Sequence, residues 1–302
     1  MKVAVIVVNY NDAEQTVSYV NKIKEYNNIQ RIVVVDNLST DTETMEKLSK
    51  IYSHKVSIVQ TENNGGYAYG NNFGVKYLDS QNENYDYIII SNADIEVEST
   101  AIDKCLQVFE NDKTVGIVAP RMYNSNNKPI RRSCWKIRTF ALDVIHSTRL
   151  LELLFYKKLR AGEYSDDEYK KELLQVEAIS GAFFIVRYEA FKKANYLDEN
   201  VFLFYEEDIL AKKMKENGYK VFCRNDIKFI HYESKTIGKT LSYYKKIKQL
   251  YNSKMYYHKK YNKINKIQIF IFQILNICRK IELIIEIPLR KILQFTAKLK
   301  KS

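Results

Sequence analysis

Carboxylates that follow two hydrophobic segments are the first residues of this sequence that could do chemistry. Asp36 follows the segment 31–35, and Asp94 follows the segment 85–91. A single carboxylate such as Asp94, with Asn92 beside it, cannot enclose a divalent cation. It suits Mg²⁺ or Mn²⁺, because these ions take most of their other ligands from water and substrate phosphates. The alternative is that Asp94 only caps the turn after a strand.

A second group of acids, Glu206, Glu207 and Asp208, follows the apolar residues 201–205 and begins a predicted helix. Negative charge at a helix N-terminus stabilises the positive end of the helix dipole by roughly 0.3–1 kcal/mol, so these acids could have a capping role alone. Three adjacent carboxylates also repel one another. This repulsion raises the pKa of at least one of them, which would suit a general base.

The segment 63–74 is rich in glycine and holds four of the nine glycines of the chain. Glycine lets the backbone approach a ligand closely, so this loop is a candidate binding segment. It contains no Gly-x-Gly and lacks the Gly-Lys-Ser/Thr ending of a P-loop, which disfavours dinucleotide and ATP sites. Elsewhere, a lone His231 at a strand end favours a structural role, and Ser133 and Cys134 have no partners nearby that would activate a nucleophile.

Alternating strand-like and helix-like segments must position these residues. Near-continuous β-branched runs at 2–8, 31–37, 56–60 and 85–94 predict strands buried on both faces, and apolar residues between them have helical spacing. Such alternation indicates a doubly wound α/β domain, in which ligands bind beyond the carboxyl ends of the strands. Asp36 and Asp94 lie at such ends. Further strands are predicted within 114–123, 179–191 and 221–231.

The net charge of +12 is unevenly distributed along the 302 residues. Residues 1–234 carry 31 Lys and Arg against 34 Asp and Glu, whereas residues 235–302 carry 17 against 2. A near-neutral body with a basic tail indicates an anionic partner, either nucleic acid or a membrane surface. A hydrophobic content of 46% excludes a disordered chain, and four scattered cysteines indicate neither a disulfide framework nor a zinc finger. The N-terminus enters a strand pattern at once, so we expect no signal peptide.

The ordered motifs of residues 2–235 resemble those of family 2 glycosyltransferases, the inverting enzymes of the GT-A fold. Among them they look most like bacterial rhamnosyltransferase-type members that build capsule or other surface polysaccharides. The resemblance implies a Rossmann-like, single-sheet GT-A domain over 1–234, with a nucleotide-sugar half to about 120 and an acceptor half over about 121–234. A basic helical extension over 235–302 would follow. The motifs that carry the resemblance are VIVVNYND, VVVDN, NNGGYAYGNNFG, SNAD, ISGAFFIVRYEAF and LDENVFLFYEED.

The resemblance also implies roles for individual residues. Those expected at the nucleotide are Asn9, Tyr10, Asn11, Asp36, Gly65, Gly66, Asn71 and Asn92. Asp94 would hold Mg²⁺ or Mn²⁺ with the diphosphate, and the later motif FIHYESKT places His231 near the same group. Asp208 would be the catalytic base and Glu207 its neighbour. Many members have a second acid two residues after the base, where this chain has Leu210, so the choice between Glu207 and Asp208 stays open.

The tail predicts where such an enzyme works. Its apolar stretch 267–278 has 12 residues, fewer than the roughly 20 that span a bilayer. Basic helices with an apolar face fit an interfacial helix on anionic lipid. A helical pair packed on the catalytic domain or on another subunit fits as well, which leaves a homo-oligomer open. With a lipid-linked acceptor, the expected location is cytoplasmic, peripheral on the inner face of the cell membrane.

The expected function is metal-dependent, inverting transfer of a sugar from UDP-hexose or dTDP-rhamnose to a hydroxyl of a glycan or lipid-linked saccharide. Two alternatives rank lower. A nucleic-acid-binding protein would leave Asp36, Asp94, Asp208 and the glycine-rich loop without a shared purpose, so we expect no nucleic-acid partner. A sugar nucleotidyltransferase should have a Gly-rich loop with Arg and Lys after the first strand, where this chain has residues 9–12, Asn-Tyr-Asn-Asp.

Overall fold

The computed structural model describes residues 1–232 and 243–299. The end of the motif FIHYESKT and the first residues of the predicted tail, 235–242, lie outside the described residues. The first half of the chain alternates strands with helices, as the hydrophobic pattern predicts. Its elements are β1 (Val3–Asn9), α1 (Ala13–Ile23), β2 (Arg31–Asp36), α2 (Thr44–Ser49), β3 (Val56–Gln60), α3 (Tyr67–Ser80) and β4 (Tyr87–Ser91).

The second half is less regular and contains short strands that the sequence pattern did not predict. Its sheet elements are β5 (Ile95–Val97), β6 (Val115–Asn124), β7 (Cys134–Trp135), β8 (Leu173–Val176), β9 (Ala178–Ile179), β10 (Phe183–Arg187) and β11 (Lys220–His231). Its helices up to residue 216 are α4 (Ser99–Asn111), α5 (Phe140–Ile145), α6 (Arg149–Leu154), α7 (Tyr188–Lys193) and α8 (Glu206–Glu216), with short 3₁₀ turns at Arg131–Ser133, Tyr156–Lys158 and Glu168–Lys170.

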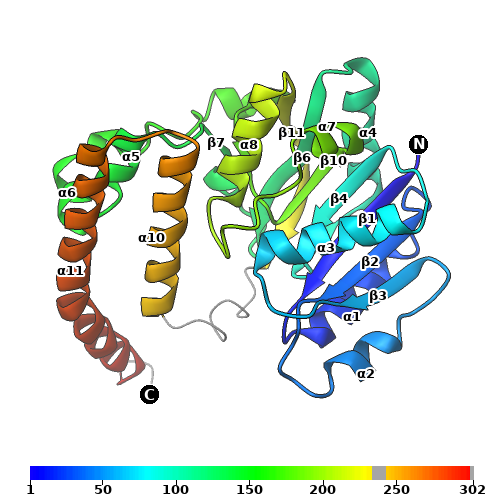
Figure 1. Cartoon of the computed structure of the whole chain (residues 1–302), viewed down its shortest axis with the longest axis horizontal. Helices are drawn as coiled ribbons and strands as arrows, with labels where there is room; N and C mark the ends of the chain where they lie inside the picture. The colour runs from blue at the N-terminus through cyan, green and yellow to red at the C-terminus, as the bar shows by residue number, and fades with distance from the viewer. Residues whose placement is uncertain (233–242, 300–302) are drawn as a thin grey trace. The chain divides into compact units, whose positions relative to one another are not determined.

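Within the described residues, one large mixed sheet has the strand order β3-β2-β1-β4-β10-β6-β11-β5, and β8 also pairs with β11 (Figure 1). The first four strands in this order are parallel, so their carboxyl ends share one edge. Strand β10 runs antiparallel to β4 and pairs Phe183 with Ser91. The start of β10 therefore lies beside the end of β4, which brings the loop before β10 to the edge where Asp94 follows β4.

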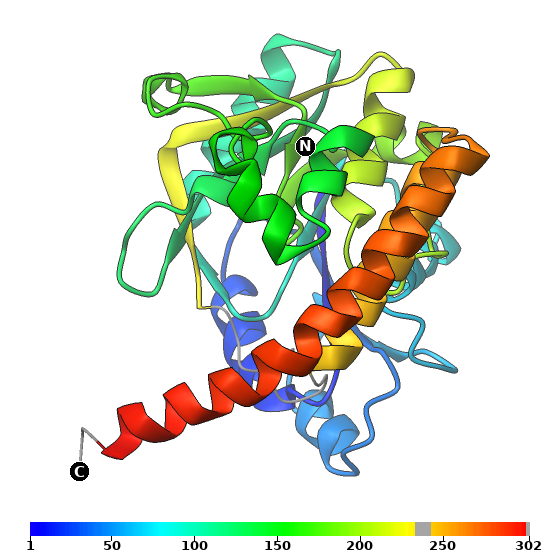
Figure 2. The same ribbon diagram turned by 90° about the vertical axis from the view of Figure 1, so that its left-hand side faces the viewer.

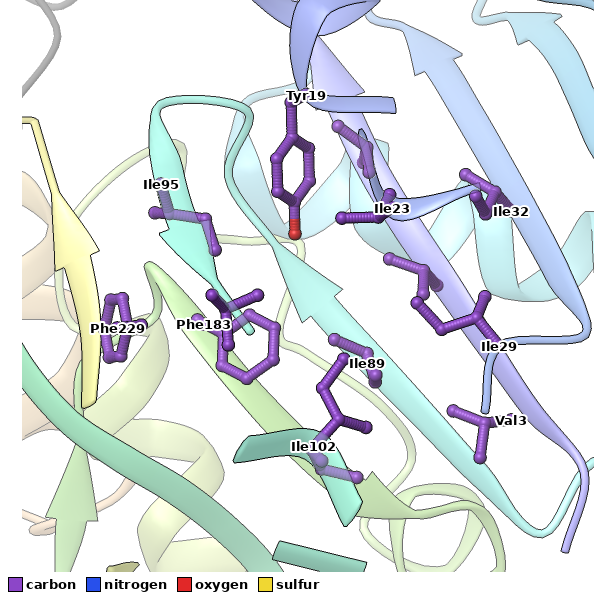
Figure 3. Close-up of a cluster of buried hydrophobic side chains, with 14 of the residues drawn as sticks. Val3, Tyr19, Ile23, Ile29, Ile32, Ile89, Ile95, Ile102, Phe183 and Phe229 are labelled. Carbon is purple, nitrogen blue, oxygen red and sulfur yellow. The ribbon is translucent and has the colours of Figure 1, made fainter. Parts of the chain in front are cut away.

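The sheet is buried on both faces. Alternate residues of β1 belong to different clusters: Val3, Val5 and Val7 pack on one side, Ala4 and Ile6 on the other. Figure 3 shows the first cluster, in which Tyr19 and Ile23 of α1 and Ile102 of α4 cover the strands. Helices α3, α7 and α8 supply residues to the second cluster. Burial on both faces explains why the strands are continuous apolar runs and holds the residues after them firmly.

The chain divides into two compact units. The first comprises residues 1–137 and 163–253 and contains the sheet; the second comprises residues 138–162 and 254–302. Helix α10 (Tyr243–Lys260) contributes to both, and α11 (Lys266–Leu299) is one long helix of the second unit (Figure 2). Residues 138–162 therefore group with residues 254–302, although a division of the chain at 234/235 would separate these two segments.

The second unit has an interior of its own. The ring of Phe272 in α11 lies 4.8 Å from that of Phe140 and 5.1 Å from that of His258, measured between centroids. The buried carboxylate of Asp143 accepts a 2.8 Å hydrogen bond from Nε2 of His258, and Lys254 donates to its backbone carbonyl at 3.2 Å. No helix in the described ranges 1–232 and 243–299 has the length and hydropathy needed to cross a bilayer.

Candidate active site

The ends of β1 and β2 form a buried polar pair. Asn9 and Asp36 are partners in the parallel register, and Nδ2 of Asn9 donates to Oδ1 of Asp36 at 2.9 Å. Asp36 is fully buried and also accepts from Oγ of Ser39 at 2.5 Å and Nε2 of Gln60 at 2.8 Å. Thr16 holds the other side of Asn9 through a 2.9 Å bond to its Oδ1. These bonds fix both side chains at the strand edge, where the sequence placed them.

The residues after β1 continue this polar edge. Asn11 has a positive φ of 54°. Its side chain reaches the loop after β2, where Oδ1 accepts from the backbone N–H of Thr40 at 2.8 Å. Its own backbone N–H donates to Oγ of Ser39 at 2.8 Å. Tyr10, between the two asparagines, is half-buried. These hydrogen bonds therefore hold the loop after β1 and the loop after β2 in a fixed arrangement.

The glycine-rich loop is held tightly at Gly66. This residue has φ of 90°, and a Cβ at this position would lie 2.1 Å from the carbonyl oxygen of Phe202. A side chain is therefore excluded both by conformation and by space. Next to it, the N–H of Tyr67 donates to the same carbonyl at 3.0 Å. At Gly65, a Cβ would meet the ring of Tyr69 at 2.4 Å, so both glycines permit close approach of neighbouring groups.

Asn71 lies in the first turns of α3 and is 1% exposed. Its Nδ2 donates to the carbonyl of Tyr67 at 2.9 Å. Its Oδ1 is buried and has no hydrogen-bond partner among the described residues. Asn71 thus braces the start of the helix that the glycine-rich loop enters.

Asp94 and His231 come together at the edge of the sheet, although they are far apart in sequence. Strand β11 pairs His231 with Ile95, and Nε2 of His231 lies 3.3 Å from Oδ2 of Asp94. Both side chains retain some exposure, 19% for His231 and 10% for Asp94. Asn92, two residues earlier, donates its backbone N–H to the carbonyl of Ala182 at 2.8 Å. Within the described residues, no group of three or more His, Cys, Asp and Glu side chains is arranged to hold a metal.

The acids at the start of α8 occupy different environments. Glu207 is half-buried, and its Oε1 accepts the backbone N–H of Gly181 at 3.1 Å. Asp208 is 2% exposed, and its Oδ1 accepts the indole N–H of Trp135 at 3.2 Å. Tyr67 closes this cluster by donating to the carbonyl of Gly181 at 2.5 Å. Burial, together with the nearby charges of Glu207 and Glu206, raises the pKa of Tyr67 well above its ordinary value, so the phenol stays protonated.

Glu206 is the buried member of the triplet. Burial raises the pKa of its carboxyl well above the ordinary value, and the charge of Glu207 adds to this effect. Burial and the neighbouring charge therefore both favour the protonated form of the Glu206 carboxyl. It lines a small pocket with apolar side chains, among them Ile117, Phe184 and Leu210.

The structure brings the loop of Asp94 and the side chain of Glu207 to one edge of the sheet. The backbone N–H of Asn92 donates a hydrogen bond to the carbonyl of Ala182. The backbone N–H of the preceding Gly181 donates one to the carboxylate of Glu207.

Three residues of this cluster were not singled out from the sequence: Tyr67, Trp135 and Gly181. Trp135 is the one tryptophan of the chain, and a lone tryptophan beside charged residues is a signal that could have found it. Tyr67 lies within the glycine-rich loop, and Gly181 within the motif ISGAFF, so both belong to segments that the sequence did indicate. Their contact partners, however, are more than 25 residues away.

Comparison with known proteins agrees with this architecture. Low-salt glycan biosynthesis hexosyltransferase Agl10 of Haloferax volcanii is 26% identical over 217 residues, which are 71% of this chain and 62% of that protein. The chain thus spans less than two thirds of the length of this curated relative. One similar solved structure is that of mannosyltransferase PcManGT from Pyrobaculum calidifontis in complex with GDP-Man and Mn²⁺. The TM-score is 0.56 at 17% sequence identity, and the match covers 99% of this chain and 80% of the PcManGT chain.

A second similar structure is that of S. aureus TarS 1–349 in complex with UDP-GlcNAc. The TM-score is 0.55 at 16% sequence identity, and the match covers 85% of this chain and 65% of the TarS chain. At such identities the likeness concerns the fold, which is the GT-A fold of the glycosyltransferases. Residues 4–194, more than half of the chain, match the family described as glycosyl transferase family 2. The chain belongs to this family, and the predicted fold and family are confirmed.

Proposed function

We propose that the protein is a metal-dependent inverting glycosyltransferase that moves a sugar from a nucleoside-diphosphate sugar to a hydroxyl group. One observation carries the proposal. Asn92, in the loop of Asp94, is hydrogen-bonded to Ala182, and Glu207 is hydrogen-bonded to the adjacent Gly181, which supports a diphosphate site and a base site at one sheet edge. A transfer reaction needs these two functions on opposite sides of the reacting carbon.

The nucleotide part of the donor would lie along the ends of β1 and β2. The polar edge formed by Asn9, Asn11 and Asp36 offers hydrogen-bonding groups held rigidly by the strands, and the glycine-rich loop lets backbone approach the ligand. Tyr10 is half-buried, and we propose that the base stacks on its ring. We propose UDP-hexose or dTDP-rhamnose as donors, in keeping with the motif resemblance.

Asp94 and His231 are the residues that would hold a divalent cation. Their facing atoms lie 3.3 Å apart, a separation that suits neighbouring ligands of one ion, and the remaining positions would be filled by water and diphosphate oxygens. The carboxylate suits Mg²⁺ and Mn²⁺, while the imidazole is a better ligand for transition metals, which favours Mn²⁺. When bound, the ion would neutralise charge that develops on the departing diphosphate.

The residues of the base cluster would carry out the proton transfer. The acceptor oxygen attacks the anomeric carbon, the bond from that carbon to the diphosphate oxygen breaks, and Asp208 takes the acceptor proton. A single displacement of this kind inverts the anomeric configuration and needs one base. Trp135 holds the Asp208 carboxylate in orientation, and Gly181 holds the neighbouring Glu207.

We further propose a glycan or lipid-linked saccharide of bacterial surface polysaccharide synthesis as the acceptor, with the enzyme on the cytoplasmic face of an anionic membrane. The basic residues of the tail support this location.

The direct test is release of nucleoside diphosphate from a panel of nucleotide sugars with Mn²⁺ or Mg²⁺, followed by analysis of the anomeric configuration of the product. We expect one donor to be selected and the configuration to invert. Retained configuration, or no donor that binds in a thermal-shift screen, would refute the proposal.

A further inference from the structure

Helix α11 presents an apolar face to solvent. Within its described side chains, Phe270, Ile274, Ile277, Ile281 and Ile284 follow one another at intervals of four and three residues, which places them on one face of the helix. They are between 43% and 73% exposed. Single exposed apolar side chains are common on soluble proteins, but a continuous face of large ones marks a contact surface.

This exposed face is not the one that packs inside the second unit. The inward face of α11 supplies Phe272 and Leu283, which are 1% and 2% exposed, and Phe272 lies against Phe140. The helix therefore has one apolar face that is already buried and a second that is not. Folding of the unit accounts for the first face and leaves the second without a structural purpose.

The short helix α6, which begins beside α11, also exposes apolar side chains. Leu150, Leu153 and Leu154 are 61%, 62% and 65% exposed, and α6 buries none of its residues. The carboxylate of Glu282 accepts the backbone N–H groups of Arg149 at 2.9 Å and Leu150 at 3.2 Å, so α6 begins beside the middle of α11. Both helices belong to the second unit, and Figure 1 shows them next to each other.

The charge of this unit selects the partner. Residues 138–162 and 254–302 contain 17 Lys and Arg against 4 Asp and Glu. All four acids lie near basic side chains: Asp143 near His258, Glu152 near Arg149, and both Glu282 and Glu286 near Arg279. Exposed lysines, among them Lys157, Lys158 and Lys280, accompany the apolar face. An apolar face with cations beside it complements the acyl chains and headgroups of anionic lipid.

A second copy of the chain fits this surface less well. If Phe270 and Ile277 are taken as core positions of a coiled coil, the flanking positions hold Gln273, Cys278, Lys280 and Ile285. Paired helices normally carry opposite charges at these positions, and here no acid is present to meet Lys280 of another copy.

We propose that the outward faces of α6 and α11 together form one lipid-contacting surface, which lies in the headgroup region of an anionic bilayer. This surface rests on the membrane part of the proposed function and adds α6, which precedes α11 in the sequence by more than 100 residues. Long lysine side chains would reach the headgroups while the isoleucines and leucines enter the acyl region.

The test uses the full-length protein and the exposed thiol of Cys278 on α11, because the other three cysteines are buried. An environment-sensitive fluorophore on Cys278 should shift to the blue with vesicles that contain about 30% phosphatidylglycerol and not with pure phosphatidylcholine. Cosedimentation of unlabelled protein with the same vesicles measures affinity. The double variants are Ile277→Ser/Ile281→Ser on α11 and Leu150→Ser/Leu153→Ser on α6, and Tyr52→Ser, which is 71% exposed on the first unit, is the control.

We expect each double variant to weaken vesicle binding at least about tenfold, because burial of each such side chain stabilises the bound state. Tyr52→Ser should bind as the native chain does. Unchanged binding by the α6 variant would overturn the joint surface. A dimer in light scattering that the α11 variant converts to monomer, without vesicle binding by the native chain, would assign the surface to a second copy instead.

Turnover of soluble donor without vesicles separates this inference from the proposed function. Donor turnover with no vesicle binding would overturn the surface and leave the enzyme assignment intact. Vesicle binding that depends on both helices, without turnover of any nucleotide sugar, would support the surface and count against the enzyme assignment.

Discussion

The indole N–H of Trp135 donates a hydrogen bond to Oδ1 of Asp208 at 3.2 Å. The two residues are 73 positions apart, and the short pairing of β7 with β9 brings Trp135 to the start of α8. A hydrogen bond to a carboxylate contributes more than one between neutral groups and sets the direction in which its oxygens point. We therefore regard Trp135 as a positioning residue for the proposed base.

Trp135→Phe removes this donor and keeps an aromatic ring. We expect kcat to fall by roughly 10- to 150-fold, with little change in the KM for donor, because a hydrogen bond to a charged group contributes roughly 1.5–3 kcal/mol. Steady-state kinetics at saturating acceptor measure the effect. Tyr77→Phe, which removes a hydroxyl bonded to Ser57 away from the site, is the matched control. Equal kinetics for both variants would remove Trp135 from the site.

Asp208→Asn and Glu207→Gln separate the two candidate bases. We expect Asp208→Asn to lower kcat by roughly 100- to 10,000-fold, the range for loss of a general base, and to leave nucleotide-sugar affinity unchanged. Glu207→Gln should have the smaller effect on kcat, because Gln retains an oxygen that can accept the N–H of Gly181. The reverse order of the two effects would assign the base to Glu207.

Asp94→Ala and His231→Ala test the proposed metal pair. Each change removes one of the two facing ligand atoms, so the dissociation constant for Mn²⁺ in the presence of nucleoside diphosphate should rise about tenfold or more. Calorimetric titration with Mn²⁺ gives the value directly. Asp167→Ala, whose side chain is 87% exposed in an ion pair with Lys170, serves as the control. Native affinity in both site variants would refute the assignment.

Gly66→Ala should damage the nucleotide side of the site. The residue has φ of 90°, and a Cβ would approach the carbonyl of Phe202 to 2.1 Å, so the loop must move. We expect a loss of roughly 1–3 kcal/mol in the free energy of unfolding and weaker donor binding. Urea denaturation and donor titration measure the two effects. Gly218→Ala has a similar φ of 77° with open space around it and controls for backbone strain alone. An equal decrease in the free energy of unfolding for both variants would show that the close approach of the Gly66→Ala Cβ to the carbonyl of Phe202 does not affect stability.

Asp143→Asn should destabilise the second unit. Burial by itself would raise the pKa of Asp143, but the hydrogen bond from His258 and the charges of Lys254 and Arg138 outweigh it and hold the pKa below its usual range. The ionised carboxylate therefore contributes stability above its unfolded pKa of about 3.9, and this contribution is lost as the pH falls below that value. Removing one partner of such a buried group costs about 3–5 kcal/mol.

Thermal and urea denaturation across pH check this prediction. The difference in the free energy of unfolding between native chain and variant should be largest near neutral pH and shrink below about pH 4. Asp167→Asn, at an exposed ion pair, should change stability by less than about 1 kcal/mol at any pH. A difference for Asp143→Asn that does not depend on pH would show that the charge of the carboxylate is not responsible.

Local patterns in the sequence were sufficient for the first half of the fold. Strands buried on both faces must be continuous apolar runs, and β1 to β4 appear where those runs occur. The same patterns predicted that Asp36 and Asp94 follow strands, because the residue after a buried strand can be read from the sequence alone. Glu207 and Asp208 were likewise expected at a helix start, and α8 begins at Glu206.

Only the tertiary structure decided how these residues meet. The antiparallel pairing of β10 with β4 brings the loop of Asn92 to Ala182. The pairing of β7 with β9, each of two residues, brings Trp135 to Asp208. Strands of two residues are too short to leave a periodic pattern in the sequence. The grouping of residues 138–162 with α11 also depends on contacts between distant segments, such as that of Glu282 with the start of α6. Sequence by itself determined which residues could act, since side-chain chemistry and strand burial are local properties. Their partners depend on strand order and helix packing, which are set by the burial of the whole chain.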